Sequence, residues 1–399
     1  MLVENGFKHT DIGIIPEDWQ VDTIGTLITV LTDFTANGSF ASLAQNVTYL
    51  DHPDFARLIR LTDIRSKFTN DGIYISKESY NFLSKSKLFG GELLLANVGA
   101  YAGYSFLYEY NLPFKGSLGP NMFLIKFDKL KIDSIYIYFC FVDNYLLRQL
   151  LSKAASSAQP KLNKQNVREC LISYPPLHEQ TAIANALSDM DALIAQTEKL
   201  IEKKKAIKQG AMQELLKPKE GWVTVKIRDI AKVGRGRVIS QNEIAKSLNK
   251  SYPVYSSQTS NNGIMGYIDT YDFQGEYITW TTDGEKAGTV FHRKGKFNCT
   301  NVCGTIKLKE GNPRFIHYVL ANEAPRHVSR NLANPKLMNE PMKNIEITIP
   351  NNIEEQNSIS NTIYDLVMEL SMLEVKLQKF KQQKQGMMQT LLTGKIRLI

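Results

Sequence analysis

The sequence predicts an α+β chain in which two globular α/β bodies are separated by two long helices. These helices are expected to form an intramolecular coiled coil. Three observations carry the prediction: long segments occur twice, each long segment keeps a heptad spacing, and short strands broken by Gly, Asn and Asp fill the rest. The predicted division is a first body at 1–176, a helix at 177–217, a second body at 218–352, and a helix with a C-terminal tail at 353–399.

The composition is that of an ordinary globular protein, so each half can bury a core. Of the 399 residues, 43% are hydrophobic and 22% are charged. The net charge of +8 favours a polyanionic partner, with nucleic acid expected before an acidic membrane surface. The N-terminus shows no basic segment followed by an apolar run, no stretch approaches the ~18 apolar residues of a membrane span, and the four cysteines form no secreted framework. We therefore expect a cytoplasmic protein.

The internal repeat defines the organisation of the chain. Relative shifts of 176, 175 and 203 positions bring three pairs of segments together. Each half therefore opens at a tryptophan, runs through a variable body, and closes with a Pro-Lys-Leu segment and a long periodic segment. Matching ends and differing bodies suggest a common frame with two different recognition surfaces. The three pairs are Glu179-Gln180 with Glu355-Gln356, Pro160-Lys161-Leu162 with Pro335-Lys336-Leu337, and Trp19 with Trp222.

Each periodic segment predicts a helix of about 39 residues, or roughly 58 Å, with an apolar heptad seam. Two such helices can bury their seams against each other; the alternative is that each packs only on its own globular half. Thr197, Lys204 and Lys208 fill polar seam positions of the first segment. The apolar seam residues are Ile183, Leu187, Met190, Ile194, Ile201 and Leu215 in the first segment, and Ile359, Ile363, Leu366, Leu370, Leu373, Leu377 and Leu391 in the second.

Both bodies contain the same central phrase of strand, Gly-rich turn, strand, Lys-containing loop and strand. The first begins "GGELLLANVGAYAGY" and the second "QGEYITWTTDGEKAGT". The stretches "SIYIYFCFVDNYLLRQLLSKA" and "RFIHYVLANEAPRHV" are expected to be corresponding helices. The two bodies differ in length by about 27 positions, which limits any loop-by-loop comparison between them.

Basic and amide side chains in the loops are the candidate nucleic-acid contacts. Arg, Lys, Gln and Asn hold phosphates or read base edges, although isolated polar loops are more often simply solvated. The candidates in the second body are Arg235, Arg237, Ser257, Gln258, Asn261, Lys286, Arg293, Lys294 and Lys296. Those in the first body are Arg60, Lys85, Lys87, Tyr101 and Lys115.

Catalytic motifs are missing from the sequence. It contains no phosphate-binding P-loop, no glycine fingerprint between a strand and a helix, and no Asn-Pro-Pro-aromatic motif of amino methyltransferases. Cys299 and Cys303 could contribute to a zinc site only with His292 or His317, and two core cysteines are the simpler interpretation. We predict a binding protein; the alternatives are a coiled-coil adaptor that binds no DNA, and a nuclease or methyltransferase with an unrecognised active site.

The chain resembles the specificity (S) subunit of type I restriction-modification systems over essentially its whole length. The residues that carry the resemblance are "IPEDWQVDTIG", "QPKLNKQNVRECLISYPPLHEQTAIANAL", "NPKLMNEPMKNIEITIPNNIEEQNSI", "KKKAIKQGAMQELL" and "KQQKQGMMQTLLTGKIRL". The resemblance implies that each body is a target recognition domain for one half of a split DNA site. It also implies that the two helices pair antiparallel, which gives the chain pseudo-two-fold symmetry, and that they set the spacer and dock two methylation subunits. It further implies no catalysis, cofactor or metal in this chain. S-adenosylmethionine serves the methylation subunits, and ATP and Mg²⁺ serve the restriction subunits.

Overall fold

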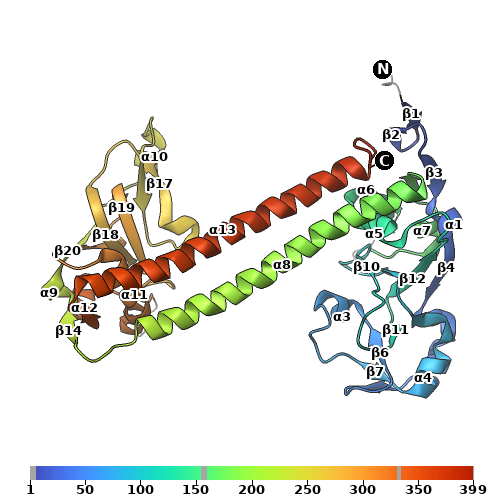
Figure 1. Ribbon diagram of the computed structural model, residues 1–399, viewed down its shortest axis with the longest axis horizontal. Helices are drawn as coiled ribbons and strands as arrows, with labels where there is room; N and C mark the ends of the chain where they lie inside the picture. The colour runs from blue at the N-terminus through green and yellow to red at the C-terminus, as the bar shows by residue number, and fades with distance from the viewer. Residues whose placement is uncertain (1–5, 154–159, 330–333, 399) are drawn as a thin grey trace. The chain divides into compact units, whose positions relative to one another are not determined.

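The computed structural model describes residues 6–153, 160–329 and 334–398. Contacts divide the chain into unit 1, residues 1–197 with 376–399, and unit 2, residues 198–375. Both cuts fall inside the long helices α8 (Leu177–Leu215) and α13 (Ile353–Leu391), so each unit combines a globular body with one end of both helices (Figure 1). Among the described helices, none is both long and apolar enough to cross a membrane.

Unit 1 contains a four-stranded sheet in the order β10-β9-β12-β4, a five-stranded sheet in the order β5-β7-β6-β11-β8, and the pairs β1-β2 and β13-β3. Its strands are β1 Phe7–Thr10, β2 Gly13–Pro16, β3 Gln20–Thr23, β4 Ile28–Asp33, β5 Tyr49–Leu50, β6 Ala56–Ile59, β7 Tyr74–Ile75, β8 Lys87–Leu88, β9 Leu93–Ala96, β10 Ser105–Leu107, β11 Gly116–Leu118, β12 Met122–Phe127 and β13 Leu171–Tyr174. Its shorter helices are α1 Ile24–Leu27, α2 Phe40–Asn46, α3 Leu61–Arg65, α4 Lys77–Phe82, α5 Ser134–Val142, α6 Asn144–Lys153 and α7 Lys164–Arg168, with 3-10 turns at Phe34–Asn37 and Ser84–Ser86.

Unit 2 contains one six-stranded sheet in the order β15-β20-β18-β19-β16-β17 and the pair β14-β21. Its strands are β14 Trp222–Lys226, β15 Ala231–Arg235, β16 Tyr252–Tyr255, β17 Ile264–Ile268, β18 Phe273–Thr281, β19 Val290–Cys299, β20 Cys303–Leu308 and β21 Glu346–Pro350. Its shorter helices are α9 Ile227–Ile230, α10 Gln241–Lys246, α11 Pro313–Glu323 and α12 Asn339–Asn344, with 3-10 turns at Ser260–Gly263 and Ala324–His327. The predicted mixture of short strands and few helices is confirmed.

One predicted helix was wrong in its extent. The stretch that starts at Ser134 was expected to be continuous, but it divides into α5 and α6 at Asp143. Asp143 has an extended backbone, with ψ of 144°, which a helix cannot contain. Its counterpart α11 ends at Glu323, two residues before Pro325, whose ring cannot continue an α-helix.

The repeated Glu-Gln pair fastens the start of each long helix to its own body. Gln180 is fully buried; its Oε1 accepts from the Asp133 backbone N–H at 2.9 Å. Gln356 is 4% exposed, and its Oε1 accepts from the Asn312 N–H at 3.0 Å. Each amide group also donates to the carbonyl of the proline that precedes its helix. Since Asp133 and Asn312 are the N-caps of α5 and α11, the same three-way joint is built in both units.

Both long helices have the predicted 39 residues, and every predicted seam residue is buried or half-buried. Ile183 and Leu187 near the start of α8 share the core of unit 1 with Leu391 at the end of α13. Leu215 at the end of α8 shares the core of unit 2 with Ile359 near the start of α13. The start of one helix therefore packs beside the end of the other within each unit, which confirms antiparallel pairing. The helix ends also pack on the globular bodies. The helices therefore bury their seams both against each other and against their own halves.

Two lysines at the seam, one in each unit, are neutralised across the helix pair. In unit 1 the ammonium of Lys384 lies 2.6 Å from a carboxylate oxygen of Asp191 and 5.1 Å from the centre of the Phe139 ring. In unit 2 Lys204 lies 2.7 Å from Glu369. These pairs allow lysines at seam positions because a half-buried ammonium keeps an acidic partner.

Candidate nucleic-acid interface

The central phrase of each body folds into the same glycine-containing loop. We call residues 97–104, which join β9 to β10, and residues 282–289, which join β18 to β19, the glycine loops. Gly99 and Gly284 have φ of +85° and +93°, and Gly103 and Gly288 have φ of +89° and +82°. Glycine adopts this region at little cost, so the four glycines let both loops take one backbone course.

The repeated Pro-Lys-Leu segments brace these loops. In unit 1, the Gly99 N–H donates to the Pro160 carbonyl at 2.9 Å, and the Leu162 N–H donates to the Asn97 carbonyl at 2.8 Å. In unit 2, the equivalent bonds of Gly284 with Pro335 and of Leu337 with Thr282 are 3.0 and 2.9 Å. Two motifs that are distant in sequence thus form one loop-and-strap unit in each body. The frame is constant, and the side chains on the loop differ.

Tyr101 and Lys286 occupy the same place on the two glycine loops. The carbonyl of Tyr101 accepts from the N–H of Tyr104, and that of Lys286 accepts from the N–H of Thr289. Both side chains are exposed. The guanidinium of Arg65 stacks on the Tyr101 ring at 3.9 Å, and the ammonium of Lys286 lies 3.5 Å from the exposed carboxylate of Glu285. The first glycine loop therefore presents an aromatic ring with a stacked cation, and the second presents an exposed ammonium. The same backbone frame carries two different surfaces.

The strand beside each loop ends in a further charged residue. In unit 1 the carboxylate of Asp33, at the end of β4, lies 2.9 Å from the ammonium of Lys164. Burial alone would raise the pKa of Asp33, but hydrogen bonds from Lys164 and Thr35 lower it below the usual value. In unit 2 the register places Arg235 of β15 at the matching position, where its guanidinium is exposed and touches the Met338 sulfur at 3.5 Å. This end of the sheet is therefore neutral in unit 1 and cationic in unit 2.

Several other candidates in unit 2 have structural partners. Arg237 donates to Glu243 of α10 and to Asp272, the residue before β18, at 3.0 Å each, so its charge is neutralised. Gln258 and Asn261 both donate to the Ile264 carbonyl and shape their own loop.

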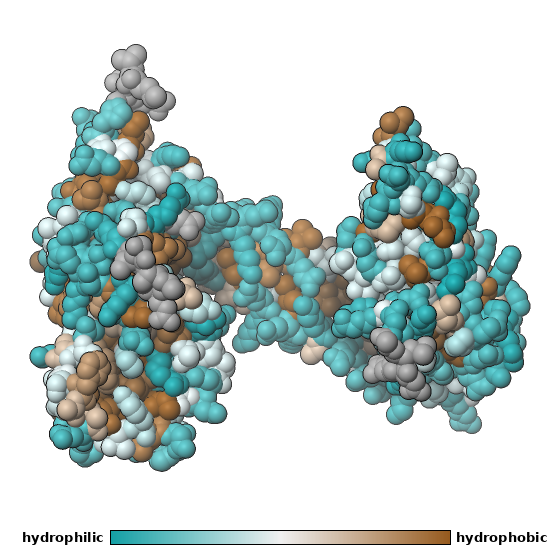
Figure 2. All heavy atoms as spheres, turned by 180° about the vertical axis from the view of Figure 1, so that it is seen from behind, coloured by the Kyte–Doolittle hydropathy of each residue, from teal (hydrophilic) through white to brown (hydrophobic). Residues whose placement is uncertain are grey.

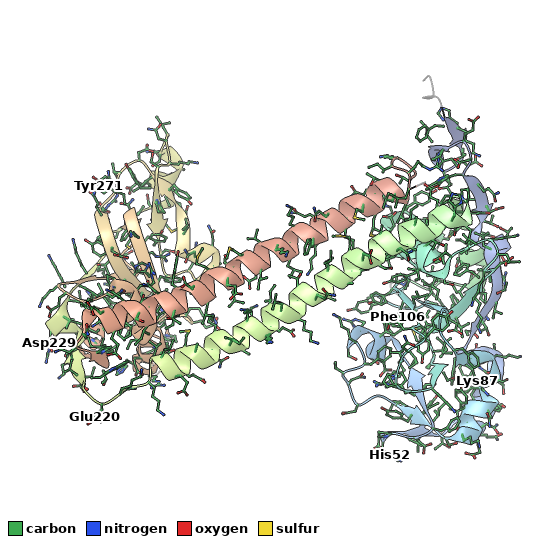
Figure 3. The ribbon with its side chains drawn as sticks, in the orientation of Figure 1. His52, Lys87, Phe106, Glu220, Asp229 and Tyr271 are labelled. Atoms are coloured by element: carbon green, nitrogen blue, oxygen red, sulfur yellow. The ribbon has the colours of Figure 1, made fainter. Side chains whose placement is uncertain are left out.

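Arg293 was expected at the surface, but the structure places it 3% exposed inside unit 2. Its guanidinium lies 3.7 Å from the centre of the Tyr255 ring and donates to the Asn262 carbonyl at 2.8 Å. The register of β19 explains the placement: Arg293 points to the opposite face from its exposed neighbour Lys294. Lys296 is exposed, with its ammonium 4.5 Å from the ring of Tyr271, which Figure 3 labels, and Ser257 is half-buried.

The candidates in unit 1 lie on separate elements rather than in one cluster. Arg60 pairs with buried Asp63 at 2.9 Å. Lys85 donates to the Ala36 carbonyl at 3.0 Å. Lys87, labelled in Figure 3, and Lys115 each lie over an aromatic ring, at 4.5 and 4.2 Å from its centre. Of the five predicted residues, Tyr101 alone belongs to the glycine loop.

Sequence reasoning missed Arg65 and an aromatic groove of about 740 Å³ beside the first glycine loop. The groove is lined by Phe40, which is 83% exposed, by Tyr49, which is 54% exposed, and by Lys161 of the strap. An aromatic residue in a short segment gives no sign in the sequence of being exposed, so these residues could not be distinguished from core positions.

Cys299 and Cys303 are both buried, beside Phe297, as two core cysteines would be. Burial raises the pKa of the Cys299 thiol. Among residues 6–153, 160–329 and 334–398, no three His, Cys, Asp or Glu side chains gather in the way that metal ligands do.

Comparison with known proteins identifies the frame. A family model for the type I restriction modification DNA specificity domain matches residues 16–208 and again residues 219–382. Two putative type I specificity subunits of Mycoplasma pneumoniae are 35% and 34% identical over 206 and 215 residues, covering about half of this chain and 80% and 78% of theirs. The type I restriction enzyme MpnII specificity subunit of the same organism is 40% identical over 143 residues, 35% of this chain and 42% of that protein.

The crystal structure of a type I restriction-modification S subunit from M. genitalium superposes with a TM-score of 0.63 and covers 98% of both chains. At 15% identity this likeness concerns the fold alone. With the specificity domain matched twice, over most of its length, the chain belongs to the family of type I restriction-modification specificity subunits.

Proposed function

We propose that this chain reads a bipartite site on double-stranded DNA, with the body of each unit contacting one half-site. The observation that carries the proposal is the repeated loop-and-strap unit, whose backbone is constant while its exposed side chains differ. A constant frame places both loops in the same way against a duplex. The different exposed side chains on the two glycine loops then contact different bases, since side chains read sequence at the base edges.

The chain itself supplies recognition and no bond chemistry in this proposal. Methylation subunits bind S-adenosylmethionine and transfer its methyl group to adenine N6, and restriction subunits use ATP and Mg²⁺ to translocate and cleave DNA. All of these act in the cytoplasm with DNA as substrate. Membership of the specificity-subunit family supports this division of labour.

The long helices offer a docking surface for the methylation subunits. In unit 2, Leu200 and Ile207 of α8 are about 40% exposed, and Met368 and Val375 of α13 are 40% and 68% exposed. The members of each pair are seven residues apart, so each pair lies along one face of its helix. Figure 2 shows such apolar side chains among polar ones on the helices. Apolar residues at heptad spacing outside the seam suit a helical partner.

Exchange of the second body tests the proposal. Replacing residues 218–352 with the corresponding body of another family member is expected to change one half of the methylated site and leave the other half unchanged. Methylation-sensitive sequencing of cells that carry the exchanged chain and its methylation subunits measures this. An exchange of the first body, at 1–176, is the matched control and should alter only the opposite half. A change in both halves, or in neither, contradicts the proposal, and turnover of DNA by the isolated chain would favour an enzyme instead.

The tips of the glycine loops are expected to act separately. Tyr101→Ala removes an exposed ring and should weaken binding to one half-site by about 1–3 kcal/mol, with reduced selectivity there. Lys286→Ala should act on the other half-site only. Competition binding with duplexes altered in one half at a time distinguishes the two. Glu310→Ala, which changes an exposed residue outside both glycine loops, is the control and should leave binding to both half-sites unchanged. Equal effects of Tyr101→Ala on both half-sites would refute this assignment.

A further inference from the structure

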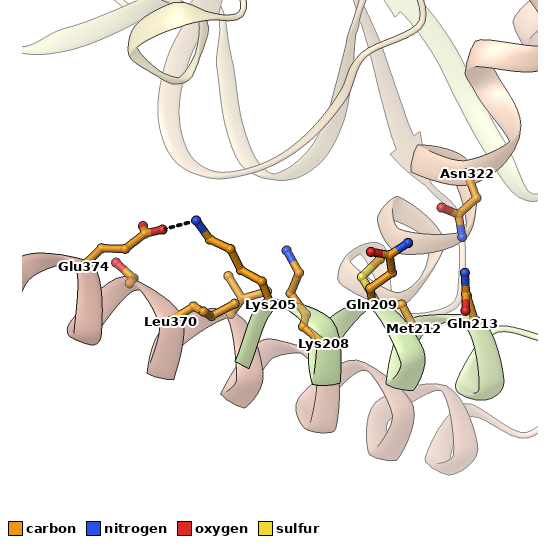
Figure 4. Close-up of a pocket in the computed structure, with 10 residues that line it drawn as sticks. Lys205, Lys208, Gln209, Met212, Gln213, Asn322, Leu370 and Glu374 are labelled. Atoms are coloured by element: carbon orange, nitrogen blue, oxygen red, sulfur yellow. Dashed lines mark ion pairs between the residues drawn. The ribbon is translucent and has the colours of Figure 1, made fainter. Parts of the chain in front are cut away.

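Unit 2 contains an open pocket of about 740 Å³ where the helices α8 and α13 meet the recognition body. Three cationic side chains line it: Lys208 of α8, Lys294 of β19 and Arg314 of α11. None of its lining residues is a carboxylate. Figure 4 shows the adjoining pocket, which shares Lys208 and in which this side chain extends from α8 toward the body.

The charge of the pocket is available to a ligand. Within the part of the chain that the structure describes, Lys208 and Lys294 have no acidic side chain within ion-pair distance. By contrast Lys205, one turn earlier on α8, is held 3.3 Å from Glu374 (Figure 4). Arg314 lies over the Tyr364 ring at 4.1 Å and donates one hydrogen bond to Asn361 at 3.5 Å, which leaves the other N–H groups of its guanidinium for a ligand.

The two histidines of the pocket add no charge at neutral pH. Burial, together with the nearby positive charge of Arg293, lowers the pKa of His317 to about 4. Burial also lowers the pKa of His292, despite its 2.9 Å contact with Glu276. The cations are therefore the two lysines and the arginine, which stay protonated over the physiological range.

The same place in unit 1 is closed by an ion pair. The repeat shift of 176 positions places Lys208 on Lys384 and Val367 on Asp191. In unit 1 Lys384 and Asp191 are 2.6 Å apart. In unit 2 the acid is replaced by Val367, which lines the pocket, so the equivalent lysine is left without a partner. One repeat thus uses this lysine to join the helices, and the other frees it.

We propose that this pocket binds a backbone phosphate of the recognised DNA, through Lys208, Lys294 and Arg314. The inference rests on the proposed function of the chain. Asn262, from the loop that Arg293 anchors, also lines the pocket, so the pocket is continuous with the recognition body. Ammonium and guanidinium groups suit a phosphate, and Glu276, which lies opposite Lys294 on β18, contacts His292 instead. The chain therefore holds DNA asymmetrically, with an added phosphate contact beside the second half-site.

The salt dependence of binding tests this site. The double variant Lys208→Gln/Lys294→Gln, assembled with its methylation subunits, should lose this one phosphate contact. The slope of log K against log salt concentration should then become shallower by about 0.9, so that the loss of affinity between 50 and 200 mM salt is about 3.5-fold smaller. Affinity should fall equally for the cognate duplex and for one altered in either half-site, because phosphates carry no sequence information.

Lys384→Gln is the matched control, since it removes the same residue type from the equivalent position of unit 1. Its salt slope should equal that of the parent complex. A parent slope in the double variant, or an equal change in the control, would overturn the inference. So would normal DNA binding by a variant that no longer assembles with methylation subunits, because the pocket would then hold a protein. A parent complex that binds no DNA would overturn the proposed function and this inference with it.

Discussion

Replacement of Asp63 by alanine is expected to destabilise unit 1 by about 3–5 kcal/mol, because it leaves a buried arginine without its partner. Asp63 is fully buried and Arg57 is 4% exposed. The guanidinium of Arg57 lies 3.0 Å from Oδ1 of Asp63, and that of Arg60 lies 2.9 Å from Oδ2. Asn70 donates to the same carboxylate at 2.8 Å. Arg57 is further enclosed by Phe68, at 5.4 Å from its ring centre, so its charge would remain buried in the variant.

The destabilisation caused by Asp63→Ala is expected to depend on pH. Burial alone would raise the pKa of Asp63, but its hydrogen bonds with Arg60, Asn70 and Arg57 lower it below the value of a free aspartate. Stabilisation by the carboxylate is therefore complete above about pH 4, the pKa in the unfolded chain, and is lost as the pH falls through the folded value. The difference in stability between parent and variant should be largest near pH 7 and shrink in acid.

Urea unfolding monitored by hydrogen exchange of unit 1 measures this effect. Asp71→Ala, which removes an exposed aspartate from the same loop, is the control and should change stability by less than about 0.5 kcal/mol. Arg65 lies at the end of α3, which Asp63 helps to cap, so the variant should also bind one half-site more weakly while the other is read normally. A destabilisation below about 1 kcal/mol would contradict the role of the network.

Deletion of one heptad from both long helices is expected to shorten the spacer of the recognised site by about three base pairs. Seven helical residues rise about 10 Å, and a base pair rises 3.4 Å. Removing Ile194–Leu200 and Val375–Lys381 together keeps the pairs Asp191–Lys384 and Lys204–Glu369, so the helices can still pair in each unit. Three base pairs also turn the duplex by about 100°, so affinity should fall even for the best spacer.

Methylation-sensitive sequencing reports the spacer, and both half-sites should stay the same. Deleting the heptad from one helix alone is the control, since it shifts the pairing of the seam and should abolish methylation. An unchanged spacer in the double deletion would show that the helices do not set the distance between half-sites.

The periodic and repeated parts of this protein could be predicted from the sequence because their information is local. Heptad spacing within 39 consecutive residues identifies each helix, and two such helices with apolar seams need each other as partners. The Glu-Gln and Pro-Lys-Leu repeats also indicated which positions are important for the structure. Their purpose, however, was invisible, since the contacts of Gln180 with Asp133 and of Pro160 with Gly99 join residues distant in sequence.

The surface of the bodies was decided by the tertiary structure. Three arginines of the second body could not be distinguished in the sequence. In the structure Arg235 is exposed, Arg237 is neutralised by two carboxylates, and Arg293 is buried against an aromatic ring. Lys208 and Lys384 occupy the same position of a repeat, and only the residue opposite makes one of them free. The sequence by itself determined the frame, because helix period and repeat are properties of neighbouring residues. Tertiary structure decided which charges face a ligand, because that depends on partners that the chain brings together only on folding.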